Sequence, residues 1–371
     1  MSKDMLMWDE TIFRNPEILE LDHVPEYFAH RDNQLQSLKF ALRPAVRGMR
    51  PLNCLISGPP GTGKTTAVKK VFSELQEHVK NVVFVKINCQ IDSTRFAVMA
   101  KIYENLLKVS PPSSGVSFGK VFQKVVNHLI TSDRILVVAL DDINYLFHEG
   151  HADEVMYSLL RAHEQYPGAR IGVIAIVSDT GTMYKFDPRV GSVFLPEEIA
   201  FPRYGSREIQ DIINNRVLHA FFPHVVPAEV QEKIVEYTDL TGDLRIGIDL
   251  LKRAGLNAER KASRIVSIED VEKAYEASRL LHLCRNIGTL NEHEKTLLRL
   301  IAQGKEPQTG ELYKEFHETT QLGYTRFYEL VEKLNSSQYI DADFSGKGMR
   351  GRTRIIRTRY NPADILHCLE K

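Results

Sequence analysis

The chain has 371 residues, 43% of them hydrophobic, and its 48 basic and 48 acidic side chains give a formal net charge of zero. This length suggests two or three domains with a sizeable core, and the charge balance excludes binding to nucleic acid through bulk charge alone. The longest apolar runs, residues 135–140 and 171–177, are far shorter than the roughly 20 residues that span a bilayer, so no membrane partner is expected.

Between residues 50 and 202 short β-rich runs alternate with helical stretches. The runs are NCLIS at 53–57, VVFVKIN at 82–88, ILVVAL at 135–140, IGVIAIV at 171–177 and EEIAF at 197–201. Such alternation predicts a parallel sheet with helices on both faces. We place this α/β domain at residues 1–203.

A glycine-rich loop follows the first of these runs. Residues 58–65, Gly-Pro-Pro-Gly-Thr-Gly-Lys-Thr, fit the pattern GxxxxGK[ST] between a strand and a helix that begins near Thr65. In this pattern backbone N–H groups turn toward phosphate oxygens, Lys64 reaches the β- and γ-phosphates and Thr65 offers its hydroxyl to Mg²⁺. The predicted nucleotide-binding residues of the loop are Gly58, Pro60, Gly61, Thr62, Gly63, Lys64, Thr65 and Thr66.

Two adjacent carboxylates end the third run, at Asp141 and Asp142. In a nucleotidase with a phosphate loop, the acid that ends a buried strand holds the Mg²⁺ shell, and a neighbouring acid can orient or deprotonate the attacking water. We therefore predict Asp141 as a metal-side residue together with Thr65, and Asp142 as the catalytic base. An isolated acid pair would more simply begin a solvated loop, but the complete phosphate loop upstream favours the catalytic interpretation.

From Gly205 to about Leu283 strand-like runs nearly vanish and the helical period takes over. Leu244, Ile248 and Leu251 recur at helical spacing behind Asp243, which is a suitable N-cap. The sequence therefore predicts a separate helical domain at residues 204–283.

Residues 284–371 carry the pattern of a winged-helix domain. Apolar side chains predict helices around 297–301 and 312–316, and a third helix from near Gly323 through Leu334. Two strand-like pieces follow, QYIDADF at 338–344 and RTRIIRTRY at 352–360, joined by the glycine-rich SGKGMRG. Three helices and a glycine-tipped hairpin make this fold.

The hairpin is the strongest candidate for contact with DNA. Residues 345–359 hold six basic side chains and no acid, which is a local electrostatic footprint in an otherwise neutral chain. We expect Lys347, Met349 and Arg350 at the tip, and Arg352 and Arg354 along the backbone phosphates. The alternative is an edge strand whose charges protect it from aggregation.

The third helix of this domain offers a second contact with the duplex. Thr325 and Arg326 lie at its start, whereas acids follow later, so only its N-terminal end is expected to approach the major groove. Tyr324 and Tyr328 could contact DNA or could equally be aromatic residues that pack at the edge of the domain core.

The amino terminus and the cysteines indicate the compartment. The chain begins MSKDMLMWDE, with acids where a secretory signal needs a basic start and an apolar stretch. Four cysteines, at positions 54, 89, 284 and 368, form no Cys-x-x-Cys pair, which argues against a disulfide framework and a structural zinc site. We expect a cytoplasmic protein in a reducing compartment.

The phosphate loop, the acid pair and the turn GDLR at 242–245 together resemble an AAA+ ATPase. Nearly the whole chain is similar to the archaeal initiator family related to the origin recognition complex and the cell-division-control loader. The resemblance is carried by AHRDNQLQSL at 29–38, FDPRVGSVF at 186–194, FPRYGSREIQDIINNR at 201–216, HAFFPHVVPAEV at 219–230 and GDLRIGIDLLKRAG at 242–255.

The resemblance implies further site residues. His30 and Arg31 match the segment near the adenine, and Tyr204 and Arg216 match positions that contact the nucleotide. Arg245 matches the sensor arginine that the helical lid brings toward the phosphates. A separate arginine, Arg189, matches the one offered to a neighbouring subunit's nucleotide, a task that suits a permanent charge with a forked geometry. An initiator-specific insertion at about 90–130 implies DNA contacts at Ser114, Gly115 and Lys120.

Two departures from the family pattern affect hydrolysis. The family usually has Glu as the second acid, whereas this chain has Asp142, whose carboxylate is about one C–C bond shorter in reach. The polar residue after the fourth run is usually Asn, whereas here it is Ser178, the expected water-positioning residue. We expect a weak ATPase in which ATP, ADP and Mg²⁺ serve as a slow switch.

Three functions remain open at this point. The first is an initiator that binds double-stranded origin DNA, assembles with other initiator subunits and helps recruit or load the replicative helicase, in the cytoplasm and at the nucleoid. The second is a clamp-loader-like or remodelling ATPase, which the basic hairpin and the two departures disfavour. The third is a regulatory paralogue that binds origins or promoters without loading activity.

Overall fold

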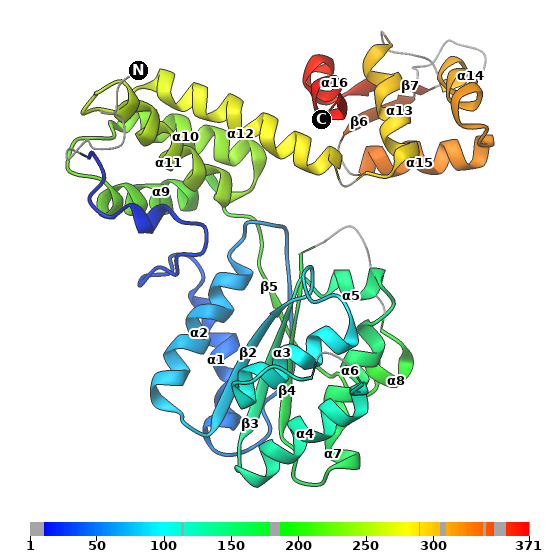
Figure 1. Cartoon of the computed structure of the whole chain (residues 1–371). Helices are drawn as coiled ribbons and strands as arrows, with labels where there is room; N and C mark the ends of the chain where they lie inside the picture. Colours follow the sequence, from blue (N-terminus) through cyan, green and yellow to red (C-terminus); the bar gives the residue numbers. More distant parts are fainter. Residues whose placement is uncertain are drawn as a thin grey trace. The chain divides into compact units, whose positions relative to one another are not determined.

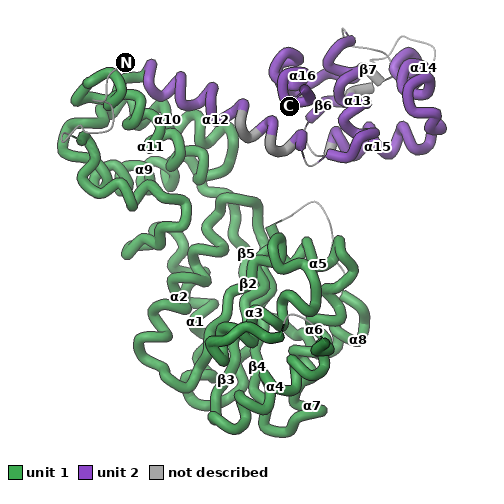
Figure 2. The backbone as a smooth tube through the Cα atoms, in the orientation of Figure 1, with its two compact units in different colours: residues 1–268 green, residues 269–371 purple. Residues whose placement is uncertain are grey.

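The structure is a computed structural model that describes residues 11–112, 115–178, 186–288, 290–304, 309–336, 339–344 and 354–370. The chain divides into two compact units, residues 1–268 and 269–371 (Figure 2), and each is described by itself. In the part of the chain that the structure describes, no helix is long and apolar enough to cross a membrane.

The first unit is built on a five-stranded parallel sheet in the order β2-β3-β4-β1-β5 (Figure 1). Its strands are β1 (Cys54–Ser57), β2 (Val82–Asn88), β3 (Ile135–Asp141), β4 (Ile171–Val177) and β5 (Glu197–Ala200). The predicted α/β sheet is therefore confirmed. Because β3 lies inside the sheet and both faces are covered, all seven of its residues are buried, which explains its continuous apolar run.

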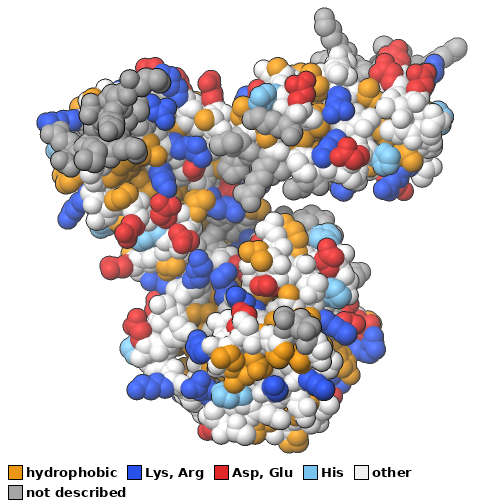
Figure 3. All heavy atoms as spheres, viewed as in Figure 1, with side chains coloured by type: hydrophobic (Ala, Val, Ile, Leu, Met, Phe, Trp, Pro, Cys, Tyr) orange, Lys and Arg blue, Asp and Glu red, His pale blue; other side chains and the backbone are white. Residues whose placement is uncertain are grey.

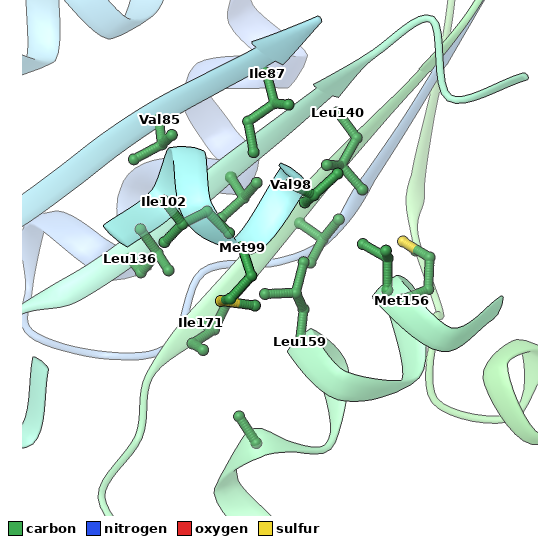
Figure 4. Close-up of a cluster of buried hydrophobic side chains, with 14 of the residues drawn as sticks. Val85, Ile87, Val98, Met99, Ile102, Leu136, Leu140, Met156, Leu159 and Ile171 are labelled. Carbon is green, nitrogen blue, oxygen red and sulfur yellow. The ribbon is translucent and has the colours of Figure 1, made fainter. Parts of the chain in front are cut away.

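Alternate side chains of the strands enter two separate cores. Val82 and Phe84 face α1 (Asp32–Val46) and α2 (Lys64–His78), whereas Val85 and Ile87 face the opposite layer. Figure 4 shows this second core, where Val85, Ile87, Leu136 and Leu140 of the sheet meet Val98, Met99 and Ile102 of one helix and Met156 and Leu159 of another. The period of two along each strand thus decides which helices cover which face.

Three helices form most of the layer over the second core. They are α3 (Arg95–Leu107), α4 (Phe118–Thr131) and α6 (Ala152–Leu160). The region that the family resemblance marks as an insertion, 90–130, thus supplies two core helices, α3 with the buried Ile102 and α4 with the buried Val125. Short helices complete this part: α5 (Asn144–His148), α7 (Ala162–Gln165) and α8 (Pro188–Gly191).

A group of helices follows β5 in the first unit. These are α9 (Ser206–Ala220), α10 (Ala228–Thr241) and α11 (Leu244–Arg260), which pack on one another. The amino-terminal arm joins them: the short helix η2 (Pro16–Leu19) packs on α9 and α11, and Phe13 pairs with Phe221. Helices therefore replace strands in this region as predicted, while the boundaries at 203 and 283 stay predictions.

The second unit is a small helical domain with a hairpin. It contains α13 (Glu292–Gln303), α14 (Thr309–Thr320), α15 (Tyr324–Ser336), the antiparallel strands β6 (Ile340–Phe344) and β7 (Arg354–Thr358), and α16 (Pro362–Glu370). The third predicted helix is α15, and Phe327, Leu330, Val331 and Leu334 are buried in one core with Ile340 and Ile356. The last turns of α12 (Ile268–Gly288) enter the same core through Leu283 and Ile287.

A disulfide joins Cys284 of α12 to Cys368 of α16, with the two Cα atoms 4.5 Å apart. The expectation that the cysteines form no disulfide is wrong for this pair. The spacing of 84 residues conceals it, because only the packing of the last helix against α12 brings the two thiols together. Cys54 and Cys89 are buried free thiols.

Candidate functional site

The phosphate loop connects β1 to α2 and depends on backbone conformations that glycine favours. Gly61 and Gly63 have φ values of +72° and +91°. A Cβ at Gly63 would lie 2.8 Å from Phe28 Cζ and 3.0 Å from the Tyr204 hydroxyl, and one at Gly61 would collide with the Asp243 carboxylate. The loop is therefore a tight backbone cradle at the N-terminus of a 15-residue helix, which is a suitable place for an anion.

Lys64 lies at the start of α2 and folds back over this loop. Its Nζ donates to the carbonyl oxygens of Gly58 at 2.8 Å and Pro59 at 2.7 Å, and only 5% of the residue is exposed. Burial lowers the pKa of Lys64 to about 8, although Asp142 acts in the opposite direction. A buried cation whose hydrogen bonds within the described residues go to carbonyl oxygens fits the phosphates of a nucleotide.

Thr65 and Asp141 lie together at the other side of the loop. The Thr65 hydroxyl donates to Asp141 Oδ1 at 2.9 Å. Burial raises the pKa of the Asp141 carboxyl, and Lys86 and the Thr65 hydroxyl oppose this shift. Among the described residues no cluster of three His, Cys, Asp or Glu could hold a metal. The Thr65 hydroxyl oxygen and an Asp141 carboxylate oxygen could serve as ligands of Mg²⁺, which commonly takes its remaining ligands from water and substrate phosphates.

Lys86 belongs to this site and was missed by the sequence analysis. Its Nζ lies 3.3 Å from Asp141 Oδ2, and the Asp141 side chain is 8% exposed. Lys86 stands opposite Ala139 in the β2–β3 pairing. The signal in the sequence was a single charge inside the apolar run VVFVKIN.

Asp142 has a buried oxygen with no partner. Its φ is +55°, and Oδ1 makes no hydrogen bond among the described residues. A left-handed conformation is tolerable for aspartate but uncommon. Asn144 Oδ1 is likewise buried and unpaired within the described chain.

Ser178 directly follows the end of β4. The last residue of that strand, Val177, pairs with Ser57, which lies just before the phosphate loop.

Arg245 begins the lid helix α11 and pairs with Asp243. Asp243 caps the helix by accepting the Arg245 backbone N–H at 3.0 Å, as predicted, and it also accepts from the guanidinium Nε at 2.9 Å and Nη2 at 2.5 Å. This local pair holds the pKa of the Arg245 guanidinium above its usual range.

Arg189 shows the same local pairing on α8. Asp187 accepts from its backbone N–H at 2.8 Å, from its Nε at 3.0 Å and from its Nη2 at 3.1 Å. The Arg189 side chain is 76% exposed. Such exposure is a requirement for the predicted contact with a neighbouring subunit, and that contact stays a prediction.

Arg31 and Tyr204 form a buried stack beside the loop. The Arg31 guanidinium lies 3.7 Å from the centroid of the Tyr204 ring, and its N–H groups donate to the carbonyl oxygens of Thr62, Pro202 and His30. These bonds give Arg31 a structural task, which is to join the loop to the connection between β5 and α9. His30 itself lies 3.1 Å from Asp211 of α9. Contacts of these residues with adenine stay predictions.

Arg216 of α9 is 8% exposed and donates to the carbonyl of Ile18 in the amino-terminal arm. Burial lowers the pKa of its guanidinium. In this structure Arg216 anchors the arm on the lid helices, and its predicted contact with nucleotide stays untested.

Family models match three consecutive parts of the chain: an AAA ATPase domain at residues 27–174, a Cdc6 AAA+ ATPase-type lid domain at 210–276 and a CDC6 C-terminal winged-helix domain at 285–367. The ORC1-type DNA replication protein 2 of Methanosarcina mazei is 62% identical over 368 residues, which is 99% of both chains. The chain belongs to the family of ORC1-type DNA replication proteins. The AAA+ fold, the lid and the winged helix predicted from the sequence are thereby confirmed.

Solved structures show the same architecture. The structure of the Aeropyrum pernix ORC1 protein in complex with DNA has a TM-score of 0.79 and 26% identity, and the match covers 98% of each chain. The Aeropyrum pernix ORC2 protein in ADPNP-ADP complexes has a TM-score of 0.73 and 22% identity, covering 97% of this chain and 98% of that one. The second likeness supports the fold.

The predicted DNA contacts of this ORC1-type protein are only partly described. Thr325 and Arg326 are exposed at the start of α15, where Arg326 also pairs with Glu329 at 2.7 Å. Lys120 is exposed on α4, and Gly115 has a φ of +74°. Arg354 begins β7, so the predicted hairpin is present. Four hairpin residues and one loop residue lie outside the described residues: Lys347, Met349, Arg350, Arg352 and Ser114.

Side-chain charge on the described surface is mixed. Figure 3 shows basic and acidic side chains interspersed over both units in this view. Arg359, the residue after β7, pairs with Asp341 of β6 at 2.6 Å, so this basic residue of the hairpin has an acidic partner within its own domain.

Proposed function

We propose that this chain is a replication initiator that binds double-stranded origin DNA under the control of bound ATP or ADP. The observation that carries the proposal is the phosphate loop with Lys64 buried against carbonyl oxygens, in a chain whose relatives are ORC1-type DNA replication proteins over their whole length. Acting on chromosomal DNA places the protein in the cytoplasm at the nucleoid.

In this proposal the loop residues bind the nucleotide phosphates. Lys64 leaves the carbonyl oxygens of Gly58 and Pro59 for the β- and γ-phosphates, and the backbone N–H groups at the start of α2 surround them. Mg²⁺, when bound, neutralises charge on the phosphates. Thr65 and Asp141 would hold it, since their oxygens already lie together.

Hydrolysis is proposed to be slow. Asp142 is the candidate base, and its buried Oδ1 has no hydrogen-bond partner among the described residues. The shorter reach of aspartate and the hydroxyl of Ser178 in place of an amide leave the water less firmly positioned. The expected turnover lies well below the roughly 1–100 s⁻¹ of kinases.

DNA binding is proposed for the winged helix and for the connection between α3 and α4. The proposal is supported by the exposed start of α15, which carries Arg326, and by the antiparallel pair of β6 and β7, since a winged helix uses a helix and a hairpin to contact a duplex. The DNA complex of the Aeropyrum pernix relative supports this assignment. Assembly with other initiator subunits and recruitment of the replicative helicase complete the proposal.

The test measures binding of both proposed ligands, nucleotide and DNA. Wild-type protein should bind ATP and ADP, Lys64→Ala should abolish nucleotide binding, and footprinting on genomic DNA with each nucleotide should show protected sequences at replication starts. If protein that binds DNA shows no nucleotide binding, the proposed switch is wrong. Protection only at promoters would favour a regulatory paralogue.

A further inference from the structure

Two arginines of this chain share one local arrangement. Arg189 and Arg245 each follow an aspartate by two residues, in Asp187-Pro188-Arg189 and Asp243-Leu244-Arg245. In both cases the carboxylate caps a helix through the arginine's own backbone N–H and also pairs with its guanidinium. The cap and the ion pair therefore depend on the same two oxygens.

The two arrangements differ in what surrounds them. At the start of α8 the side chains of Asp187 and Arg189 are 31% and 76% exposed, whereas those of Asp243 and Arg245 are 20% and 54% exposed. Asp243 is 20% exposed and lies against the phosphate loop, where a Cβ on Gly61 would collide with its carboxylate. On the preceding residue, Gly242, an added Cβ would meet Arg203 at 2.7 Å. The turn before α11 is thus confined between the phosphate loop and Arg203.

The confined carboxylate has consequences for phosphate binding. Asp243 and Arg245 both act electrostatically on Lys64, and Arg245 also interacts with Asp142. While Asp243 accepts from the guanidinium through both oxygens, Arg245 is paired with a carboxylate and not with a phosphate. A phosphate that enters the loop must therefore compete with a fixed carboxylate for this arginine.

We propose that Asp243 is a positioning residue that competes with the nucleotide phosphates for Arg245. Without nucleotide the guanidinium is held on Asp243. Binding of phosphate transfers it to the phosphates, and the turn at 242–243 is released from its pairing with the arginine. The inference rests on the proposed nucleotide binding and adds a residue that limits the affinity for nucleotide.

The test is Asp243→Asn in the full-length chain. Asparagine caps a helix about as well as aspartate, so the variant removes the charge and keeps the acceptor. Titration calorimetry with ATP at low ionic strength should give a Kd about three- to fivefold lower than wild type, the effect expected for a partly exposed ion pair. Asp187→Asn, the matched change on α8, should leave the Kd unchanged.

A double-mutant cycle separates competition from simple repulsion. If Asp243 acts by holding Arg245, then Asp243→Asn should have no effect on ATP affinity in an Arg245→Ala background. A gain that persists in that background would show that the carboxylate only repels phosphate, and the inference would be wrong. Equal ATP affinity of wild type and Asp243→Asn, at equal melting temperature, would also overturn it.

Two further measurements keep the result interpretable if Asp243→Asn folds poorly or if nucleotide binding itself fails. Should Asp243→Asn fold poorly by circular dichroism, Asp243→Ser offers another good N-cap without charge and should show the same tighter binding. Lys64→Ala in the same titration distinguishes a failure of nucleotide binding from a failure of the role of Asp243. Wild type that binds no ATP contradicts the proposed function. If wild type binds ATP, Lys64→Ala does not, and Asp243→Asn has the Kd of wild type, only the proposed role of Asp243 is contradicted.

Discussion

Nucleotide binding should take up a proton at Lys64. In the nucleotide-free protein burial lowers the pKa of Lys64 to about 8 from the ordinary 10.5. Phosphates around the ammonium favour its charged form and raise the pKa again on binding. Binding above pH 8 therefore requires protonation first, and the affinity should fall as the pH rises.

The magnitude follows from the two protonation states. With a pKa of about 8, Lys64 is mostly charged near pH 7 and roughly 90% neutral near pH 9, so the Kd for ADP should rise about tenfold between these values. Binding near pH 9 should take up about 0.9 proton per nucleotide. Calorimetry in two buffers of different ionisation enthalpy measures this uptake, and EDTA removes any contribution from metal.

The same shift has a consequence for stability without nucleotide. A lysine whose pKa is lower in the folded protein binds fewer protons there than in the unfolded chain, so the free energy of unfolding should rise as the pH increases from about 8 to 10.5. The difference approaches about 3 kcal/mol. Lys64→Met should flatten this rise of the free energy of unfolding with pH.

A Kd for ADP that stays constant from pH 7 to 9, with no proton uptake on binding, would refute the statement that Lys64 is protonated when nucleotide binds.

Four further outcomes are expected. Asp142→Asn should bind ATP with unchanged Kd while its phosphate release, followed in a coupled assay, falls at least tenfold. Lys86→Met should lower the free energy of unfolding by roughly 1–3 kcal/mol, because it leaves Asp141 without its cation, and Mg-ADP should recover more of this loss than ADP alone in thermal denaturation. Cys284→Ser, and likewise a reducing agent, should destabilise the second unit by about 2–5 kcal/mol, since the disulfide closes a loop of 84 residues. Combining Arg350→Ala with Lys120→Ala should weaken duplex binding more than either change and reduce its salt dependence in fluorescence anisotropy.

The strands and the phosphate loop could be predicted because local sequence determines them. β3 can be recognised in the sequence as a continuous apolar run, because the strand is buried on both faces. The phosphate loop needs glycines and Lys64 at fixed spacing. Such patterns depend on a few neighbouring residues, so one sequence is enough to read them.

Contacts between distant segments could not be predicted in the same way. Nothing near Arg31 or Arg216 in sequence shows that Arg31 stacks on Tyr204 or that Arg216 holds the amino-terminal arm. The family resemblance places both arginines near the nucleotide, which stays a prediction, and in this structure their N–H groups donate to backbone carbonyl oxygens. Burial decides such partners, because a guanidinium inside a protein must satisfy its donors nearby.

The last helix shows a local signal that was overlooked. Asn361 accepts the backbone N–H of Ala363 at 2.9 Å, and Pro362 occupies the first helical position of α16. Ile365 and Cys368 then face the core three residues apart. Reading this cap would have placed Cys368 on a helix that packs inward, but burial alone does not require a partner, since Cys54 and Cys89 are buried free thiols. Cys284 of α12 packs against the same core as Cys368, so the disulfide depends on the packing of two helices that lie far apart in sequence and not on the local cap alone.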